Sequence, residues 1–260
     1  MAIIGFDCNT KLSYKMARKF KIIDMNFVIR YVGRYKMNTK IDIDKIEKNN
    51  ILKAGLDLGI VQHCPGKPGI IPSGKLGKTW GINAREFSKK VEYKKDCIVY
   101  LDLENVNIKF KNKQQLIYDY INYWAEEVIK YYTPGIYVGY NGFMSSQQLY
   151  YKLKFIMDYW KSCSFVPNIY RRGYAMKQEA HSPMFGIPID KNTLTGDKLG
   201  RFPQFMKGQI FVDPKKDIRD AARKILTDEL KLGFSYWDNV KYFDELLYKL
   251  GVLFKDWKKF

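Results

Sequence analysis

The chain has 260 residues, 46% of them hydrophobic and 16% aromatic, a composition that excludes a disordered polymer and suits one large globular domain or two small ones. The formal net charge of +18 indicates attraction to anionic partners such as nucleic acid, anionic lipid or cell-wall polymer, although a solvated lysine-rich surface gives the same number. The apolar runs are short and interrupted, so none is expected to span a bilayer.

Short β-like runs alternate with helical patterns along the chain. Strands are expected at 3–8, 26–33, 59–64, 97–105, 135–141, 160–165, 173–178 and 186–192. Helices are expected at 11–20, at 42–55 with Asp42 or Asp44 as the cap and Gly55 at the end, from about 83 after a Gly/Pro-rich loop, at 112–132 and at 145–158.

This alternation predicts an α/β protein in which parallel strands are joined by helical crossovers. Eight strands in this order fit a (β/α)8 TIM-type barrel. A doubly wound open sheet is the alternative, but its Gly-rich phosphate loop is missing after the first strand, where the sequence is "GFDCNT". The barrel is therefore the favoured fold.

The last fifty residues have a different pattern. Asp213-Pro214 is a helix-start signal, and apolar stripes through Ile218 and Ile225 and through Phe243 and Leu247 define two amphipathic helices. The predicted division is a barrel over 1–210 and a C-terminal helical segment over 211–260.

The ends of the chain and its cysteines bear on its surroundings. "MAIIGFDCNT" lacks a basic segment and a long apolar run, so we expect synthesis in the cytoplasm without a signal peptide, with release to the cell wall if the protein acts there. The four cysteines form no CxxC pair, which indicates buried thiols and no zinc site. No metal and no cofactor are expected.

Carboxylates recur where predicted strands end. Asp102 and Glu104 are two residues apart, so they point to the same side of their strand, and their position places them at the carboxyl-end mouth where barrel active sites lie. Asp7 and Asp190 hold similar positions. Six further residues near strand ends are candidate substrate-binding groups: Arg30, Tyr31, Gln62, Tyr137, Tyr140 and Gln178. A plain ion pair of the acids with lysine or arginine is the structural alternative.

Two chemistries suit such a group of acids. Glycoside hydrolysis needs one protonated acid and a second carboxylate or assisting group, whereas phosphoryl chemistry would use the carboxylates to hold a divalent metal. Tyr137 and Tyr140 favour a sugar, because aromatic faces stack on sugar rings, although ordinary packing explains them equally well. His63 and His181 are given no role.

Several of these segments resemble a known family. "GFD" in the first strand, "YLDLE" in the fourth, "PGIYVGY" in the fifth and "IDKN" in the last are similar to the glycoside hydrolase family 25 lysozymes. "FVIRYVGRY" and "ILKAGLDLGIVQ" look still more like the glycoside-hydrolase-like domains of unknown function beside that family. The resemblance covers about residues 3–195 and departs from the family at Cys8-Asn9 and at 176–178.

The resemblance implies a barrel that cleaves the β-1,4 bond after N-acetylmuramic acid in peptidoglycan. Glu104 would be the general acid, Asp102 would stabilise the transition state or orient the acetamido group, and Asp7 and Asp190 would complete the acidic floor. We further expect Glu104 to be partly protonated near neutral pH and Asp102 to stay ionised.

The sequence thus predicts a lysozyme-like peptidoglycan hydrolase of bacterial or phage origin, such as an endolysin. Its partners would be peptidoglycan or a related glycan, together with anionic cell-wall polymers. Two alternatives stay open: a non-catalytic barrel that binds cell-wall glycan, and, motivated by the charge, a nucleic-acid-binding protein or metal-dependent nuclease.

Overall fold

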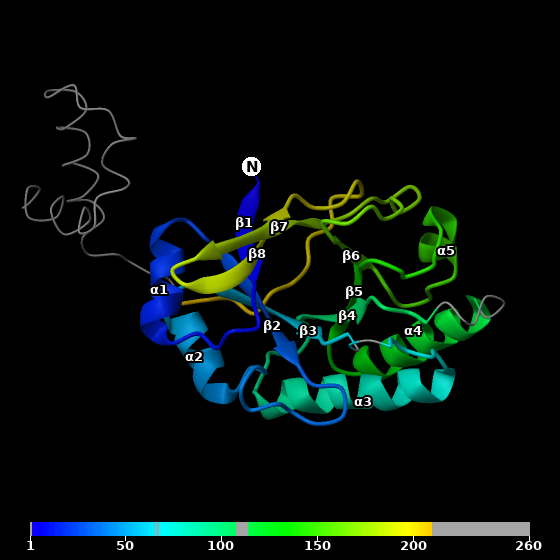
Figure 1. Ribbon diagram of the computed structural model, residues 1–260, viewed down its shortest axis with the longest axis horizontal. Helices are drawn as coiled ribbons and strands as arrows, with labels where there is room; N and C mark the ends of the chain where they lie inside the picture. Colours follow the sequence, from blue (N-terminus) through cyan, green and yellow to red (C-terminus); the bar gives the residue numbers. More distant parts are fainter. Residues whose placement is uncertain (1, 65, 67, 108–113, 210–260) are drawn as a thin grey trace, which may run out of the picture. The chain divides into compact units, whose positions relative to one another are not determined.

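Eight β-strands close into a barrel in which every strand pairs with the next along the chain (Figure 1). The computed structural model describes residues 2–64, 66, 68–107 and 114–209. The strands are β1 Ile3–Asp7, β2 Phe27–Val32, β3 Asp57–Gln62, β4 Ile98–Leu103, β5 Thr133–Val138, β6 Asp158–Lys161, β7 Met176–Met184 and β8 Ile187–Leu194. The α/β barrel predicted from the sequence is therefore confirmed.

The last strand departs from the expected all-parallel arrangement. The successive pairs from β1 to β7 are parallel, but β8 runs antiparallel to both β7 and β1. The physical reason is the connection: β7 and β8 are joined at Phe185 and Gly186, both at positive φ, and so short a turn can only reverse the chain. The resulting hairpin is the yellow ribbon in Figure 1.

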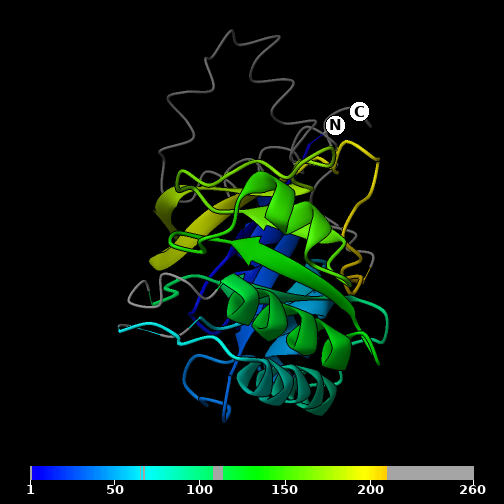
Figure 2. The same cartoon turned by 90° about the vertical axis from the view of Figure 1, so that its right-hand side faces the viewer.

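Five helices are present among the described residues: α1 Tyr14–Ile22, α2 Lys45–Lys53, α3 Gly74–Lys90, α4 Gln114–Val128 and α5 Ser146–Tyr151. Asp44 caps α2, as one of the two predicted alternatives, by accepting a hydrogen bond from the Glu47 amide. Helices α3 and α4 pack side by side on one flank of the barrel, and α1 and α2 lie together on another (Figures 1 and 2). None of the helices described is long and apolar enough to cross a membrane.

Helix α3 begins about nine residues before its predicted start. Ser73 caps it by accepting a hydrogen bond from the Leu76 amide, so the glycines taken for a loop lie inside the helix. A Cβ at Gly77 would lie 2.1 Å from the Tyr120 carbonyl oxygen, and a Cβ at Gly81 would lie 2.5 Å from that of Trp124. These glycines thus let α3 approach the backbone of α4 closely. This close packing explains why α3 contains them although glycine lowers the stability of a helix.

The predicted C-terminal segment 211–260 lies outside the described residues, so both the helices proposed there and the division at residue 210 stay predictions. The described chain ends in a segment at the amino-terminal ends of β3 and β4, where the Ile98 amide donates a hydrogen bond to the Gln204 carbonyl. There Met206 forms a two-stranded bridge with Leu58, and Phe205 joins the cluster of side chains inside the barrel.

Candidate active site

Side chains along each strand alternate between the barrel interior and the layer under the helices. The interior cluster consists of Phe27, Ile29, Val61, Ile98, Tyr100, Tyr137, Trp160, Met176, Leu194 and Phe205. On β4 the residues Ile98 and Tyr100 belong to this cluster, so the two-residue period also turns Asp102, and Glu104 just beyond the strand, toward the barrel axis. The packed interior therefore forms the floor beneath two carboxyl groups.

Asp102 and Glu104 form a close pair with Cys64, which follows β3. One carboxylate oxygen of Asp102, one of Glu104 and the Cys64 Sγ lie within 4.8 Å of one another. Asp102 is 9% exposed; its Oδ2 accepts a hydrogen bond from the Cys64 amide at 3.3 Å, while its Oδ1 has no partner among the described residues. Glu104 is half-buried and accepts a hydrogen bond from the Tyr140 amide at 3.4 Å.

Gly139 makes room for this pair. A Cβ at that position would lie 2.0 Å from the Glu104 Cγ and 2.3 Å from its Oε1. No real Cβ fits there, so the glycine after β5 allows the Glu104 side chain to lie against the backbone beside it. The packing fixes the position of the carboxyl group.

Asp7 and Asp190 form the opposite wall, as register partners in the β1–β8 pair. Asp7 is 1% exposed, and three side chains donate hydrogen bonds to it: the Tyr31 hydroxyl at 2.8 Å, Gln178 Nε2 at 3.0 Å and Asn192 Nδ2 at 2.8 Å. Asp190 lies closer to solvent, with His181 Nδ1 3.2 Å from its Oδ1. Because β8 runs antiparallel to β1, Asp190 in the first half of β8 lies opposite Asp7 at the carboxyl end of β1.

Burial governs the protonation of these acids. Desolvation raises the pKa of Asp7 to about 6, against the three hydrogen bonds that favour its ionised form. Burial likewise raises the pKa of Asp102 well above its usual range, and the charge of Glu104 raises it further. Burial raises the pKa of Glu104 too, opposed by the Tyr140 amide. Burial therefore acts against the expectation that Asp102 stays ionised, because Asp102 is the deeper acid of the pair.

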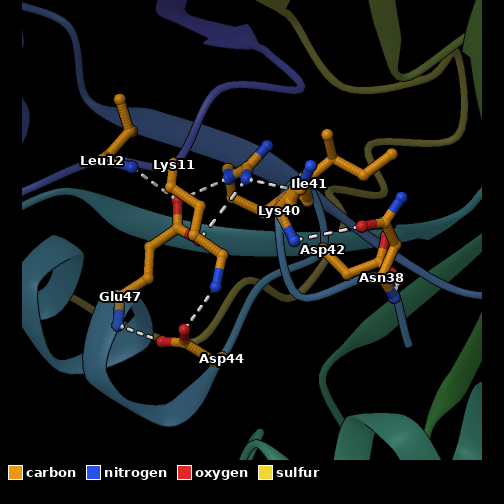
Figure 3. A network of polar contacts seen from close by, with 9 residues as sticks. Lys11, Leu12, Asn38, Lys40, Ile41, Asp42, Asp44 and Glu47 are labelled. Atoms are coloured by element: carbon orange, nitrogen blue, oxygen red, sulfur yellow. Dashed lines mark hydrogen bonds and ion pairs between the residues drawn. The ribbon is translucent and has the colours of Figure 1, made fainter.

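Arg30 is not part of the site, contrary to its prediction as a substrate-binding residue. It lies at a helix-facing position of β2, fully buried, and its Nε donates to Glu47 Oε1 at 2.7 Å and its Nη2 to the Ile41 carbonyl at 2.9 Å. Figure 3 shows Glu47 in this network, where it also accepts from the Leu12 amide. A buried arginine needs a carboxylate partner, and here Glu47 in the first turn of α2 supplies it.

Gln62 is likewise wrong as a substrate-binding residue. It faces the helix layer and is fully buried. Its Nε2 donates to the carbonyls of Gly33 and Trp80, and its Oε1 accepts from the Trp124 indole at 2.8 Å. The side chain thus satisfies polar groups between the barrel and helices α3 and α4.

The other candidates do lie at the mouth. Tyr31, Tyr137 and Gln178 point into the barrel, where the Tyr137 hydroxyl donates to Gln178 Oε1 at 2.7 Å, and Tyr140 is 61% exposed at the rim. Tyr140 also borders a pocket of about 380 Å³ that is lined by Phe143 and Phe165. This pocket lies beside Glu104, since Tyr140 and Gly139 contact both.

The sequence matches no family model, and it is not significantly similar to any curated protein. Solved structures do resemble the barrel. A Tat-secreted protein of Mycobacterium tuberculosis in complex with L-tartrate superposes with a TM-score of 0.57 at 13% identity, covering 78% of this chain and 98% of that one. A muramidase from Acremonium alcalophilum superposes with a TM-score of 0.51 at 14% identity, covering 76% of this chain and 95% of that one. A family GH25 lysozyme from Aspergillus fumigatus superposes with a TM-score of 0.50 at 14% identity, covering 76% of this chain and 96% of that one.

The chain has the fold of the family 25 lysozymes. The resemblance predicted from its strand motifs is thereby confirmed for the fold, which at this identity is all that the likeness shows.

Two residues of this site, Asn192 and Cys64, were missed by sequence reasoning. Asn192 donates to Asp7 and accepts from the Trp160 indole at 2.7 Å, so it links two interior groups. Its place two residues after Asp190 was the available signal. Cys64 was taken only for a buried thiol, because nothing in the sequence indicates that the segment after β3 returns over the acids of β4.

Within the described part of the chain, one group of side chains could hold a metal ion: Cys64, Asp102 and Glu104. A metal needs its ligands deprotonated, and burial raises the pKa values of all three. Two acids and one thiol of this kind suit proton transfer better than the binding of magnesium, which prefers several oxygen ligands. The expectation of a metal-free site stays a prediction.

Proposed function

We propose that this protein is a glycosidase that acts on peptidoglycan, cleaving the β-1,4 bond after N-acetylmuramic acid. The observation that carries the proposal is the Asp102–Glu104 pair, with one oxygen of each carboxyl group within 4.8 Å of the other at the barrel mouth and both pKa values raised by burial. A carboxyl group that holds its proton near neutral pH is what a general acid requires. The fold shared with the muramidase from Acremonium alcalophilum supports the proposal.

Glu104 would act as the general acid because it is the more accessible member of the pair. It would pass its proton to the glycosidic oxygen while the bond from the anomeric carbon to that oxygen breaks. Water then adds to the anomeric carbon, and its proton restores the carboxyl group. Positive charge that develops on the sugar would be stabilised by the nearby acids.

Asp102 would position the substrate. Its Oδ1 is buried and has no donor within the described chain, so an N–H or O–H group of a bound sugar would complete its hydrogen bonding. Asp7 is too deep to touch substrate. It would act through the side chains that donate to it, above all Tyr31 and Gln178, while Asp190 and Tyr140 lie near enough to the surface for direct contact.

The test is release of dye from labelled peptidoglycan by the whole protein and by the Glu104→Gln variant, each with and without EDTA. The proposal expects release that EDTA leaves unchanged and that Glu104→Gln abolishes. Tight binding to peptidoglycan without release by the unaltered protein would favour the non-catalytic glycan-binding barrel. Nicking of DNA that EDTA stops would favour the nuclease instead.

The binding-only alternative has one observation in its favour. Two of the four predicted catalytic acids, Asp7 and Asp102, are at least nine-tenths buried, and the pKa values of both are raised. Without an ionised carboxylate to stabilise the positive charge of the transition state, such acids would hydrogen-bond a sugar without hydrolysing it. A barrel of this kind would bind muramic-acid glycans equally well before and after Glu104→Gln, with no product formed by either protein.

A further inference from the structure

A second pocket, of about 520 Å³, lies on the other side of the acid pair from the aromatic one. Its walls come from the loop after β2 and from the end of β3: Gly33, Arg34, Tyr35, Lys36, Asn38, Ile41, Asp42, His63 and Cys64. Cys64 is shared between this pocket and the acid pair, since its amide donates to Asp102. A substrate that reaches Glu104 therefore has this pocket within reach of its neighbouring groups.

Arg34 is fixed in this pocket before any ligand arrives. Its backbone carbonyl accepts a hydrogen bond from Asn83 Nδ2 at 2.6 Å, and its guanidinium lies 5.5 Å from the centroid of the Trp80 ring. Its Nη1 donates a long hydrogen bond, 3.4 Å, to the His63 carbonyl. Stacking on an aromatic face orients the planar guanidinium and limits its rotamers.

The guanidinium of Arg34 nevertheless lacks an anion. Its Nε is buried without a hydrogen-bond partner, and no carboxylate within the described ranges makes an ion pair with it. The arginines that do meet a carboxylate are Arg30, Arg85, Arg172 and Arg201. Arg34 is thus a partly buried cation, held in place, whose natural partner is a planar oxyanion.

The one carboxylate in the pocket wall does not neutralise it. Asp42 is 2% exposed, accepts a hydrogen bond from the Asn38 amide at 2.6 Å and lies 2.8 Å from His63 Nε2. Figure 3 shows the Asp42 side chain folded back onto Asn38 within its own loop. The exposed Lys36 adds a second positive charge at the pocket wall.

We propose that this pocket binds a carboxylate carried by the substrate, through Arg34, so that the enzyme selects an acidic glycan over a neutral one. The inference rests on the proposed function for the identity of the glycan. An anionic substituent close to Glu104 needs a positive charge beside it, and Arg34 in the adjoining pocket supplies one. In peptidoglycan the carboxylate has two sources, the lactyl group of the sugar and the attached peptide.

The experiment measures binding by the full chain carrying Glu104→Gln, so that no ligand is consumed. Three oligosaccharides of equal length are titrated by calorimetry: a peptide-free strand with free lactyl carboxylates, the same strand with each lactyl group converted to its amide, and a strand that bears peptides. The acid strand should bind about tenfold or more tightly than the amide strand, the usual effect of one charge-assisted pair. Equal affinity of amide and acid strands, with tighter binding of the peptide strand, would assign the carboxylate to the peptide.

Second-site variants decide whether Arg34 is responsible. Arg34→Gln should abolish the preference for the acidic strands while leaving the affinity for the amide strand unchanged. Arg34→Lys keeps the charge but loses the planar fork and should retain part of the preference. Lys90→Gln removes one positive charge at the far end of α3 and should change nothing. A preference that survives Arg34→Gln overturns the inference.

Failure of the proposed function is distinguishable from failure of this inference. If no glycan binds, the proposed function fails, and the pocket is then tested with D-lactate alone against D-lactamide. The readout is the Arg34 Nε–H signal in nitrogen–proton correlation spectra. A saturable shift with lactate and none with lactamide supports a carboxylate site, and no shift with either overturns it.

Discussion

Asp7 provides a direct test of the electrostatics of the mouth. Burial raises its pKa from 3.8 to about 6, and a shift of about 2 units corresponds to about 3 kcal/mol. Below about pH 4 both the folded and the unfolded chain hold this proton. Between about pH 4 and pH 6 only the folded chain holds it, so this contribution to the free energy of unfolding falls as the pH rises and is lost above about pH 6.

Replacing Asp7 with Asn removes that titration. The amide oxygen can still accept from Gln178 and Asn192, while the amide nitrogen faces the Tyr31 hydroxyl, a mismatch worth about 1 kcal/mol. Asp7→Asn should therefore lower the free energy of unfolding by about 1 kcal/mol at pH 4 and raise it by about 2 kcal/mol at pH 7, the sum of the two effects.

The assay is urea unfolding of both proteins at intervals from pH 4 to pH 7, with the difference between them plotted against pH. Other titrating groups cancel in that difference. Glu126→Gln, at an exposed position of α4, is the control for loss of one negative charge. A difference between Asp7→Asn and the parent that stays constant from pH 4 to pH 7 would refute the raised pKa and the burial argument behind it.

Three further predictions follow from the fold and the charge. Arg30→Met leaves Glu47 buried without its cation and should lower the free energy of unfolding, measured in urea, by about 3 to 5 kcal/mol. The value of kcat/KM per folded molecule should stay unchanged, and a rise in KM would instead place Arg30 in the site. Gly77→Ala should destabilise by about 1 to 3 kcal/mol because its Cβ meets the Tyr120 carbonyl, whereas Gly74→Ala meets only a half-exposed tyrosine ring and should cost less in the same measurement. Adsorption to walls with anionic polymers should weaken between 0.1 M and 1 M salt, as the Debye length falls from about 10 Å to about 3 Å; adsorption that is constant over this range would mean that the charge does not serve wall binding.

The strands were predictable because their apolar runs are short and bounded by turn signals, and both ends of β1 to β4 lie within two residues of their predicted ranges. The antiparallel direction of β8 was not predicted, because residues 179–185 were left as a connection between two expected strands. In the structure β7 continues through them to Met184, so only a two-residue turn remains before β8. The start of α3 was missed for a similar reason. Gly77 and Gly81 indicate a loop by local propensity, and only the packing against α4 explains them.

The acids of the site were predictable from their positions in the strands. The alternation of strand side chains between the two faces was not applied consistently to their neighbours. Period two turns Asp102 and Tyr31 into the barrel, and the same rule turns Arg30 and Gln62 outward. Proximity to a strand end was taken as sufficient for those two residues. Cys64 and Arg34 could not be assigned, because their relation to the acids depends on how the loops after β2 and β3 fold back.

The central claim is that Glu104 donates a proton to a glycosidic oxygen, and one comparison tests it most directly. kcat/KM is measured for the unaltered protein and for Glu104→Gln on peptidoglycan and on an activated aryl glycoside, whose leaving group needs no proton. The account predicts a loss of about 10² to 10⁴ on peptidoglycan and a much smaller loss on the aryl glycoside. Undiminished activity of Glu104→Gln on peptidoglycan would contradict it.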